Sequence, residues 1–152
     1  MGKYKWTSNV RITVRDLAGN ILEQTETKNM IVKVGRKMWR DLLRGTITDG
    51  KIKYVDLGTD ATAVADAQTN LVTGVYRHAI TSDAIPADDQ YETTCYIAPA
   101  DYVGWIRELG WFAGVGAVGL GTGIMVARVL WSRNKTNIES VDITRLDSIV
   151  EG

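Results

Sequence analysis

The sequence predicts a mainly β protein: a single-domain antiparallel β-sandwich or barrel with one short amphipathic helix at about residues 33–44. Three observations predict this class. Apolar and polar residues alternate with a period of two in several short segments, and turn-forming residues separate those segments. Only one stretch has the periodicity of an amphipathic helix. Because strands do not alternate with helices, parallel βαβ units are not expected.

The first part of the chain is expected to form a hairpin followed by the helix. Residues 10–14 alternate Val, Ile and Val with polar residues, residues 16–20 favour a turn, and residues 21–27 are compatible with a second strand. In the helix, Val, Met and Leu residues form one apolar stripe, and Gly45 suits the C′ position. Further strands are expected at 52–57, 75–81, 91–98, 105–113, 124–131 and 138–145, with a loop at 82–90.

The glycine-rich stretch 105–131 admits several interpretations. Its 19 uncharged residues 109–127 have the length of a membrane span. Gly114 to Gly119 reads G-x-G-x-x-G, with Glu139 20 residues further on, as in dinucleotide-binding loops. Six glycines would also suit a flexible lid. We expect instead two buried strands joined by a glycine-rich turn, because further glycines would destabilise a helix here by about 1 kcal/mol each.

No pattern of catalytic or metal-ligating residues is found. His78 is the only histidine, and Cys95 is the only cysteine, which excludes an internal disulfide and fits a reducing compartment. A Cys95–His78 pair would require neighbouring strands. Asp88 and Asp89 lack the wider pattern of a calcium loop. We therefore predict no enzymatic activity, no catalytic, cofactor-binding or metal-binding residues, and no cofactor.

Charge is unevenly distributed along a chain of zero net charge. Residues 1–45 hold 10 Lys and Arg against 4 Asp and Glu, and residues 46–152 hold 8 against 14. Three interpretations stay open: nucleic-acid contact, a basic segment of one copy lying on an acidic face of another, and two solvated surfaces.

The amino-terminal residues, about 1–9, are expected to form an arm before the first strand. They contain Lys3, Tyr4, Lys5 and Trp6 and lack the apolar run of a secretory signal. Two aromatic rings could anchor in an apolar groove while the lysines meet acidic surface. These four residues are the predicted assembly interface, either with a neighbouring copy or with another protein, the alternative being that the segment folds back on its own domain.

Glu108 and Arg128 each interrupt an otherwise apolar segment that is expected to be a strand. Lone charges are rarely buried without a partner. We therefore predict that the two side chains pair with each other, with Arg107 or with another charged group.

Short motifs spread over nearly the whole chain resemble those of a known class of protein. They are Asn29-Met-Ile-Val32 before the helix, Val55-Asp-Leu57-Gly58-Thr59 followed by Thr69-Asn-Leu71 and Tyr76-Arg77, Ile106-Arg-Glu108-Leu-Gly110-Trp-Phe112, and Met125-Val-Ala127-Arg128-Val129 followed by Asn134-Lys135. Their order resembles small virion structural proteins of tailed bacteriophages. The chain departs from that pattern at Val75, where the pattern has a glutamate, and in its long glycine loop.

The resemblance implies a non-enzymatic, β-rich module that assembles with itself and with other virion proteins. The expected form is a capsid decoration (cement) protein, a trimer bound to the major capsid protein on the virion surface after synthesis in the host cytoplasm. The alternative is a tail, neck or baseplate/fibre-attachment protein. No membrane and no specific nucleic acid are expected as partners, and a membrane-active or nucleotide-binding protein is the distant alternative.

Overall fold

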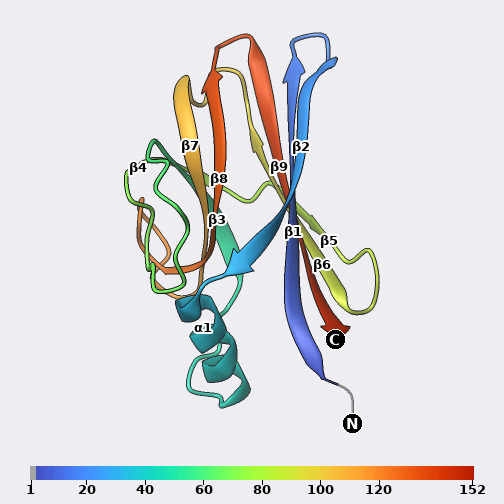
Figure 1. Ribbon diagram of the computed structural model, residues 1–152, viewed down its shortest axis with the longest axis vertical. Helices are drawn as coiled ribbons and strands as arrows, with labels where there is room; N and C mark the ends of the chain where they lie inside the picture. The colour runs from blue at the N-terminus through green and yellow to red at the C-terminus, as the bar shows by residue number, and fades with distance from the viewer. Residues whose placement is uncertain (1–2) are drawn as a thin grey trace. The chain divides into compact units, whose positions relative to one another are not determined.

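The computed structural model describes residues 3–152 and consists of antiparallel strands and one helix (Figure 1). The elements are β1 (Tyr4–Asp16), β2 (Ile21–Ile31), α1 (Lys33–Leu43), β3 (Ile52–Gly58), β4 (Gly74–Ala79), β5 (Ser82–Ala84), β6 (Gln90–Ile97), β7 (Gly104–Ala113), β8 (Ile124–Lys135) and β9 (Glu139–Glu151). Every strand pairing in this described part is antiparallel. The predicted mainly β class with one short helix is confirmed.

The chain packs as two compact units, and the single domain expected from the sequence stays a prediction. The first unit combines the described residues up to Asn29 with Ile80–Val103 and the segment from Thr136 onwards. The second combines Met30–Ala79 with Gly104–Lys135. Each unit is built from segments that are distant in the sequence, so local periodicity alone does not reveal the division.

The first unit is a sheet in which β1 pairs with β2 and β9, β9 pairs with β6, and β6 pairs with β5. Ile12 of β1 lies opposite Ile143 of β9, which lies opposite Cys95 of β6. One face is apolar and buried, with Val10, Ile12, Val14, Cys95, Ile97, Val141 and Ile143. The alternation at residues 10–14 therefore determines which face of this sheet is buried.

The turn between β1 and β2 is built from the residues expected there. Asp16 Oδ1 accepts hydrogen bonds from the backbone N–H groups of Ala18 and Asn20, both at 2.9 Å. Gly19 adopts φ +86°, in the left-handed region that favours glycine. Hydrogen bonding, above all from the Asn20 side chain, holds the pKa of the Asp16 carboxyl below its usual value.

The second unit contains β3 between β4 and β7, and β8 between β7 and the last two residues of β2, Met30 and Ile31. The strands expected on either side of the glycine-rich turn are confirmed as β7 and β8. Its core includes a cluster of four buried side chains: Phe112 of β7, Met125 of β8, Val32 at the junction before α1, and Leu71 in a loop.

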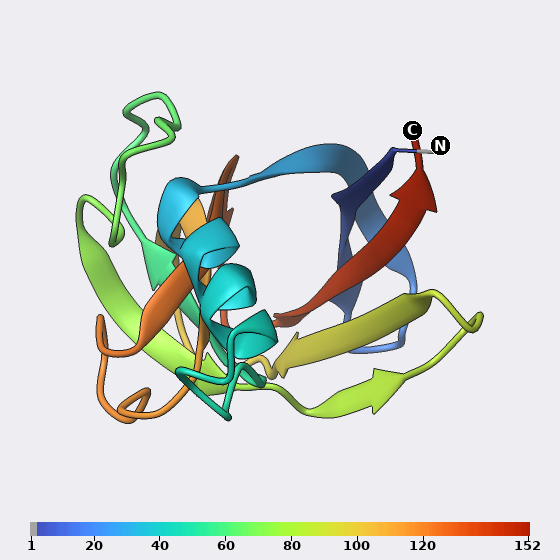
Figure 2. The ribbon, with the colours of Figure 1, turned by 90° about the horizontal axis from the view of Figure 1, so that it is seen from below.

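Helix α1 lies against β8 (Figure 2). It spans 11 residues inside the predicted range, and Gly45 adopts φ +73° after its end, as expected of a C′ residue. Gly35 makes the close approach possible, because a Cβ atom there would lie 2.7 Å from the backbone oxygen of Val126.

Several strands differ from the sequence prediction. β2 continues to Ile31, β8 to Lys135 and β9 to Glu151, beyond the expected ends at about 27, 131 and 145. β1 begins at Tyr4, because its early residues pair with the end of β9 up to Glu151. β5 lies in a segment predicted to be loop; its three residues are exposed and pair with β6 through the backbone, with Ser82 opposite Thr94. β5 has no apolar alternation that a sequence pattern could reveal, whereas Tyr4 and Trp6 alternate with lysines in phase with Val10 and Ile12, a signal that the sequence prediction did not use.

Gly35→Ala is expected to destabilise the protein even though alanine has the higher helix propensity by about 1 kcal/mol. The added methyl group meets backbone atoms of β8 that cannot move without shifting the sheet, so we expect a net loss of roughly 1–3 kcal/mol. Urea unfolding measures it. Lys37→Ala, at an exposed position of the same helix, is the control and should change stability by less than about 0.5 kcal/mol; a stabilised Gly35→Ala protein would contradict the packing.

Candidate functional site

The predicted pairing of Glu108 and Arg128 is confirmed. Arg128 Nε donates to Glu108 Oε1 at 3.2 Å, and both side chains are fully buried in the second unit. The two residues stand on neighbouring strands, with Gly110 of β7 opposite Arg128 of β8. Arg107, the other suggested partner, instead lies over the ring of Trp105 at 4.3 Å.

This buried pair fixes the loop at residues 59–73. Glu108 accepts hydrogen bonds from the backbone N–H groups of Asp60 at 2.9 Å, Val72 at 2.8 Å and Thr73 at 3.0 Å. Arg128 Nη1 donates to the carbonyl of Thr62 at 2.7 Å. The pair therefore binds both ends of the loop, where no sheet ladder satisfies the backbone.

Gly58 makes room for the glutamate. A Cβ atom at this position would lie 2.5 Å from Glu108 Cγ and 2.6 Å from the carbonyl oxygen of Thr73. The glycine in the motif Val55-Asp-Leu57-Gly58-Thr59 and the glutamate in the β7 motif are thus parts of one arrangement.

A second buried ion pair joins Asp56 of β3 to Arg77 of β4, which lie directly opposite each other. Arg77 Nε donates to Asp56 Oδ1 at 2.5 Å and Nη2 to Oδ2 at 3.0 Å. The guanidinium also lies 4.7 Å from the centre of the Tyr54 ring and 4.8 Å from that of Phe112. The arginine is held in one position by these contacts.

The glycine loop, residues 114–123, is anchored by this second pair. Asp56 Oδ2 accepts from the backbone N–H of Gly121 at 2.9 Å, and Arg77 Nη2 donates to the carbonyl of Thr122 at 2.9 Å. Asn70 Nδ2 also donates to the carbonyl of Gly121 at 3.0 Å. Anchoring from three side chains does not fit a flexible lid.

The anchored loop presents apolar side chains to solvent. Val115 is 78% exposed and Val118 is 72% exposed, and Leu120 is also exposed. Leu120 lies against Gly74, and the exposed valines Val72 and Val75 are close to Gly74 in the sequence. We define the apolar loop surface as Val72, Val75, Val115, Val118 and Leu120. Large apolar side chains exposed on a loop that is anchored by side-chain hydrogen bonds are a candidate binding surface.

The structure around the G-x-G-x-x-G residues differs from that of a dinucleotide-binding site. The G-x-G-x-x-G residues lie between two antiparallel strands, and after Gly119 the chain turns, with Thr122 N–H donating to the Gly119 carbonyl at 3.0 Å. A dinucleotide loop instead leads from a strand into a helix. Residues 3–152 also contain no helix with the length and apolarity to cross a membrane.

Three of the four predicted amino-terminal interface residues, Tyr4, Lys5 and Trp6, lie on β1 and not on a separate arm, and Lys3 directly precedes that strand. Tyr4 and Lys5 pair with the end of β9, and the Lys3 carbonyl accepts from Gly152 N–H at 2.6 Å. Trp6 Nε1 donates to Asp147 Oδ1 at 2.8 Å. The Tyr4 side chain is 73% exposed. Residues 1 and 2 of the predicted arm lie outside the described part, and whether these side chains contact another copy stays a prediction.

A third buried ion pair holds this amino-terminal strand. Arg145 Nε donates to Asp147 Oδ2 at 2.9 Å, and Nη2 donates to Oδ1 at 2.8 Å. The same Oδ1 accepts from Trp6. The carboxylate therefore links β9 to the start of β1 inside the first unit.

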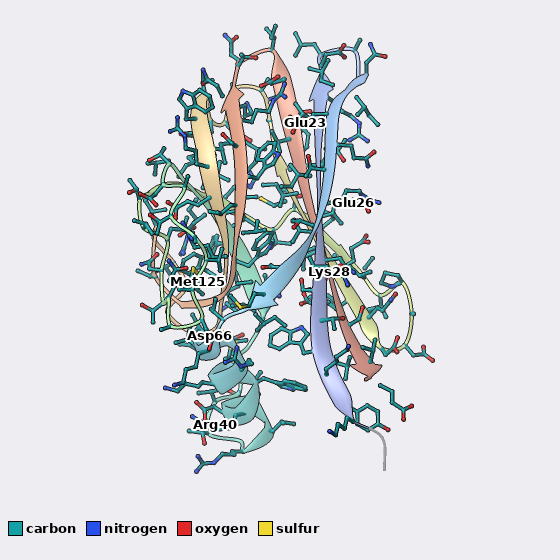
Figure 3. All side chains as sticks on the ribbon, in the orientation of Figure 1. Glu23, Glu26, Lys28, Arg40, Asp66 and Met125 are labelled. Carbon is teal, nitrogen blue, oxygen red and sulfur yellow. The ribbon has the colours of Figure 1, made fainter. Side chains whose placement is uncertain are left out.

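A hollow of about 440 Å³ lies on the polar face of the first unit's sheet. Its lining includes Asn9, Arg11, Glu26, Lys28, Glu92, Thr144 and Leu146; Figure 3 labels Glu26 and Lys28 on β2. Two cations and two carboxylates line it, so it favours neither an anion nor a cation.

No arrangement of groups for nucleophilic catalysis is formed by Cys95 and His78. β6 pairs with β5 and β9, whereas β4 pairs with β3, so the two strands are not neighbours. Burial raises the pKa of the Cys95 thiol to about 12, which keeps it protonated at neutral pH. Within the described residues, no group of three or more His, Cys, Asp or Glu side chains is placed to hold a metal ion.

Sequence reasoning missed the pairs Asp56–Arg77 and Arg145–Asp147. Their signal was the one that identified Glu108: Asp56 stands between Val55 and Leu57, and Arg145 falls on the face of residues 141 and 143. What the sequence lacks is the strand register that would assign each charge its partner.

Comparison of the chain with protein-family models, with curated proteins and with solved structures finds no match. The fold and the site thus define a mainly β protein with an anchored, apolar surface loop, and its function has to be argued from that geometry.

Glu108→Gln and Arg128→Met are each expected to lower the free energy of unfolding by roughly 3–5 kcal/mol, because each leaves a buried charge or backbone group without its partner. Urea unfolding at pH 7 measures this, and the double variant should lose less than the sum of the two. The exposed pair Arg36–Asp66 is the control: Asp66→Asn should cost under about 1 kcal/mol. Equal losses at both pairs would contradict the account.

Cys95 is expected to resist alkylation in the folded protein. With a pKa of about 12, its thiolate fraction at pH 8 is roughly 10³-fold below that of an ordinary cysteine. Iodoacetamide labelling followed by mass spectrometry measures the rate. Fast labelling of the folded chain would contradict the described burial.

The raised pKa also predicts that the thiol's contribution to stability is fully present below the unfolded-state pKa of about 8.5 and is lost as pH rises from there through the folded-state pKa of about 12.

Proposed function

We propose that this chain is a non-enzymatic structural protein of a tailed-phage virion, and that it acts as a capsid decoration protein that binds the major capsid shell and itself. The observation that carries the proposal is that residues from the separate resemblance motifs lie together around one buried ion pair. Gly58, Glu108 and Arg128 come from three separate motifs and are in mutual contact or share the same loop.

The remaining motif, Asn29-Met-Ile-Val32, contacts the same sheet. Val32, at the end of the Asn29-Met-Ile-Val32 motif, is buried in the core cluster with Met125, and its N–H donates to the Val126 carbonyl at 3.1 Å. Motif residues that are scattered along the sequence therefore build one loop-bearing sheet. A shared structural role gives the resemblance a physical basis that isolated short motifs would lack.

The apolar loop surface supplies the binding function in this proposal. Its loop is fixed before any partner arrives, so little conformational entropy is lost on binding, and its valines and leucine offer apolar area to a shell protein. Tyr4, with Lys3 and Lys5, is the second proposed contact and serves self-association, since its ring is exposed at the strand end.

The proposal is tested by binding to particles that lack the protein. We expect the wild type to bind capsids, with gold-labelled protein seen on the capsid surface by electron microscopy. Replacing Val115, Val118 and Leu120 together by Ser should weaken binding at least about tenfold. The matched control is serine at three exposed apolar positions of the first unit, Leu17, Ile21 and Ile138.

Each outcome distinguishes the alternatives. Label on tails or baseplates would replace the capsid assignment by the tail-protein alternative. Binding to neither structure would overturn the virion role. Equal losses in the loop variant and its control would remove the loop from the interface.

Tyr4→Ser should raise the apparent dissociation constant for self-association without changing the unfolding free energy by more than about 0.5 kcal/mol.

A further inference from the structure

Helix α1 carries a strongly basic surface. Residues 33–44 contain five cationic side chains and one acidic residue. The cations, all of which are exposed, are Lys33, Arg36, Lys37, Arg40 and Arg44, and we call them the basic helix face. Arg36 pairs with Asp66 at 2.7 Å and Arg40 with Asp41 at 2.9 Å; Figure 3 labels Arg40 and Asp66. The other three cations make no ion pair in the part of the chain that the structure describes.

The basic helix face is electrostatically unfavourable in the isolated chain. No acidic residue lies in the first turn of α1, where the helix dipole favours negative charge. Lys33 and Lys37, which form no ion pair in the described part of the chain, stand four residues apart, so two like charges are neighbours along the surface. A negatively charged partner would relieve both effects.

The hairpin formed by β5 and β6 has the opposite charge. Residues 80–103 contain five Asp and Glu residues and no Lys or Arg. We define the acidic hairpin surface as Asp83, Ile85, Asp88, Asp89 and Glu92. Asp83 accepts from the Tyr91 hydroxyl at 2.8 Å, whereas Asp88 and Asp89 are exposed and, among the described residues, form no ion pair.

We propose that the basic helix face of one copy binds the acidic hairpin surface of a second copy. The charges are complementary. Leu43, next to Arg44 at the end of the helix, is 77% exposed, and Ile85 of the acidic hairpin surface is 74% exposed, so the contact could bury an apolar side chain from each copy. The chain's net charge is zero, so copies do not repel each other overall. A second copy neutralises both surfaces, whereas a polyanion would satisfy only the helix.

The contact joins two different surfaces, so it is head-to-tail and propagates into a ring or an open chain of copies. An 11-residue helix and a short hairpin offer less area than a standard stable interface. The contact is therefore weak between free copies and gains strength when many copies are held together on one particle. Its biological setting rests on the proposed function, but its test does not.

Charge reversal in trans tests the proposal. The helix variant is Lys37→Glu with Arg44→Glu, and the hairpin variant is Asp88→Lys with Asp89→Lys. Sedimentation velocity at high protein concentration is compared in about 0.01 M and about 1 M salt, where the Debye length falls from about 30 to about 3 Å. We expect the wild type to associate at least about tenfold more tightly at low salt than at high salt, each variant to lose this salt-dependent association at least about tenfold, and the mixture of both variants to regain it.

Matched variants with the same change in net charge are the controls. Arg11→Glu with Lys28→Glu matches the helix variant, and Glu26→Lys with Glu151→Lys matches the hairpin variant; all four residues are exposed. These controls should associate as the wild type does.

Several results would overturn the proposal: a wild type that stays monomeric at low salt, variants that associate like their controls, or a mixture that fails to regain association. Loss of duplex DNA binding by the helix variant with unchanged self-association would assign the basic helix face to nucleic acid instead. Restored association in a protein that binds no particle would leave the contact standing while the virion role fails. Particle binding without charge-dependent association would support the virion role and overturn the proposed contact between copies.

Discussion

The second unit depends on one buried ion pair, Glu108 with Arg128. Burying both ions is costly, and their mutual attraction offsets that cost only when the other hydrogen-bonding positions are also satisfied. Here the carboxylate takes three backbone N–H groups from the ends of loop 59–73. The loop carries Leu71 into the core and Asn70 onto the glycine loop. By positioning loop 59–73, this one pair also helps to position a core residue, Leu71, and the glycine loop that Asn70 contacts.

The other two buried ion pairs act in the same way. Asp56 and Arg77 hold the glycine loop, and Asp147, bound by Arg145, holds Trp6 at the start of β1. In each case a carboxylate accepts hydrogen bonds from both an arginine and a second segment. Sheet ladders satisfy the backbone of the strands but not of the loops between them. A buried carboxylate provides acceptors at those places, and the arginine offsets its charge.

Sequence patterns predicted the elements whose signal is local and missed those whose signal is not. Alternation at residues 10–14 located the core of β1, and the stripe in α1 located the helix. The lone charges Glu108 and Arg128 stood out because their neighbours are apolar. Asp56 carried the same signal, yet its partner across β4 depends on register, which periodicity does not contain. β5 lies outside any pattern because only its backbone is used.

Buried ion pairs contribute little net stability compared with apolar packing, so their presence in three places calls for another explanation. Each one restricts the chain to a single arrangement of a loop or strand end, since any other arrangement would leave a buried charge without its partner. A protein that assembles in many copies needs every copy to present the same surface. The exposed valines of the glycine loop, held by Asp56 and Arg77, meet that requirement better than a mobile loop of the same composition would. Burying the charges costs free energy, and in return every copy presents the same binding surface, which fits the proposed structural role.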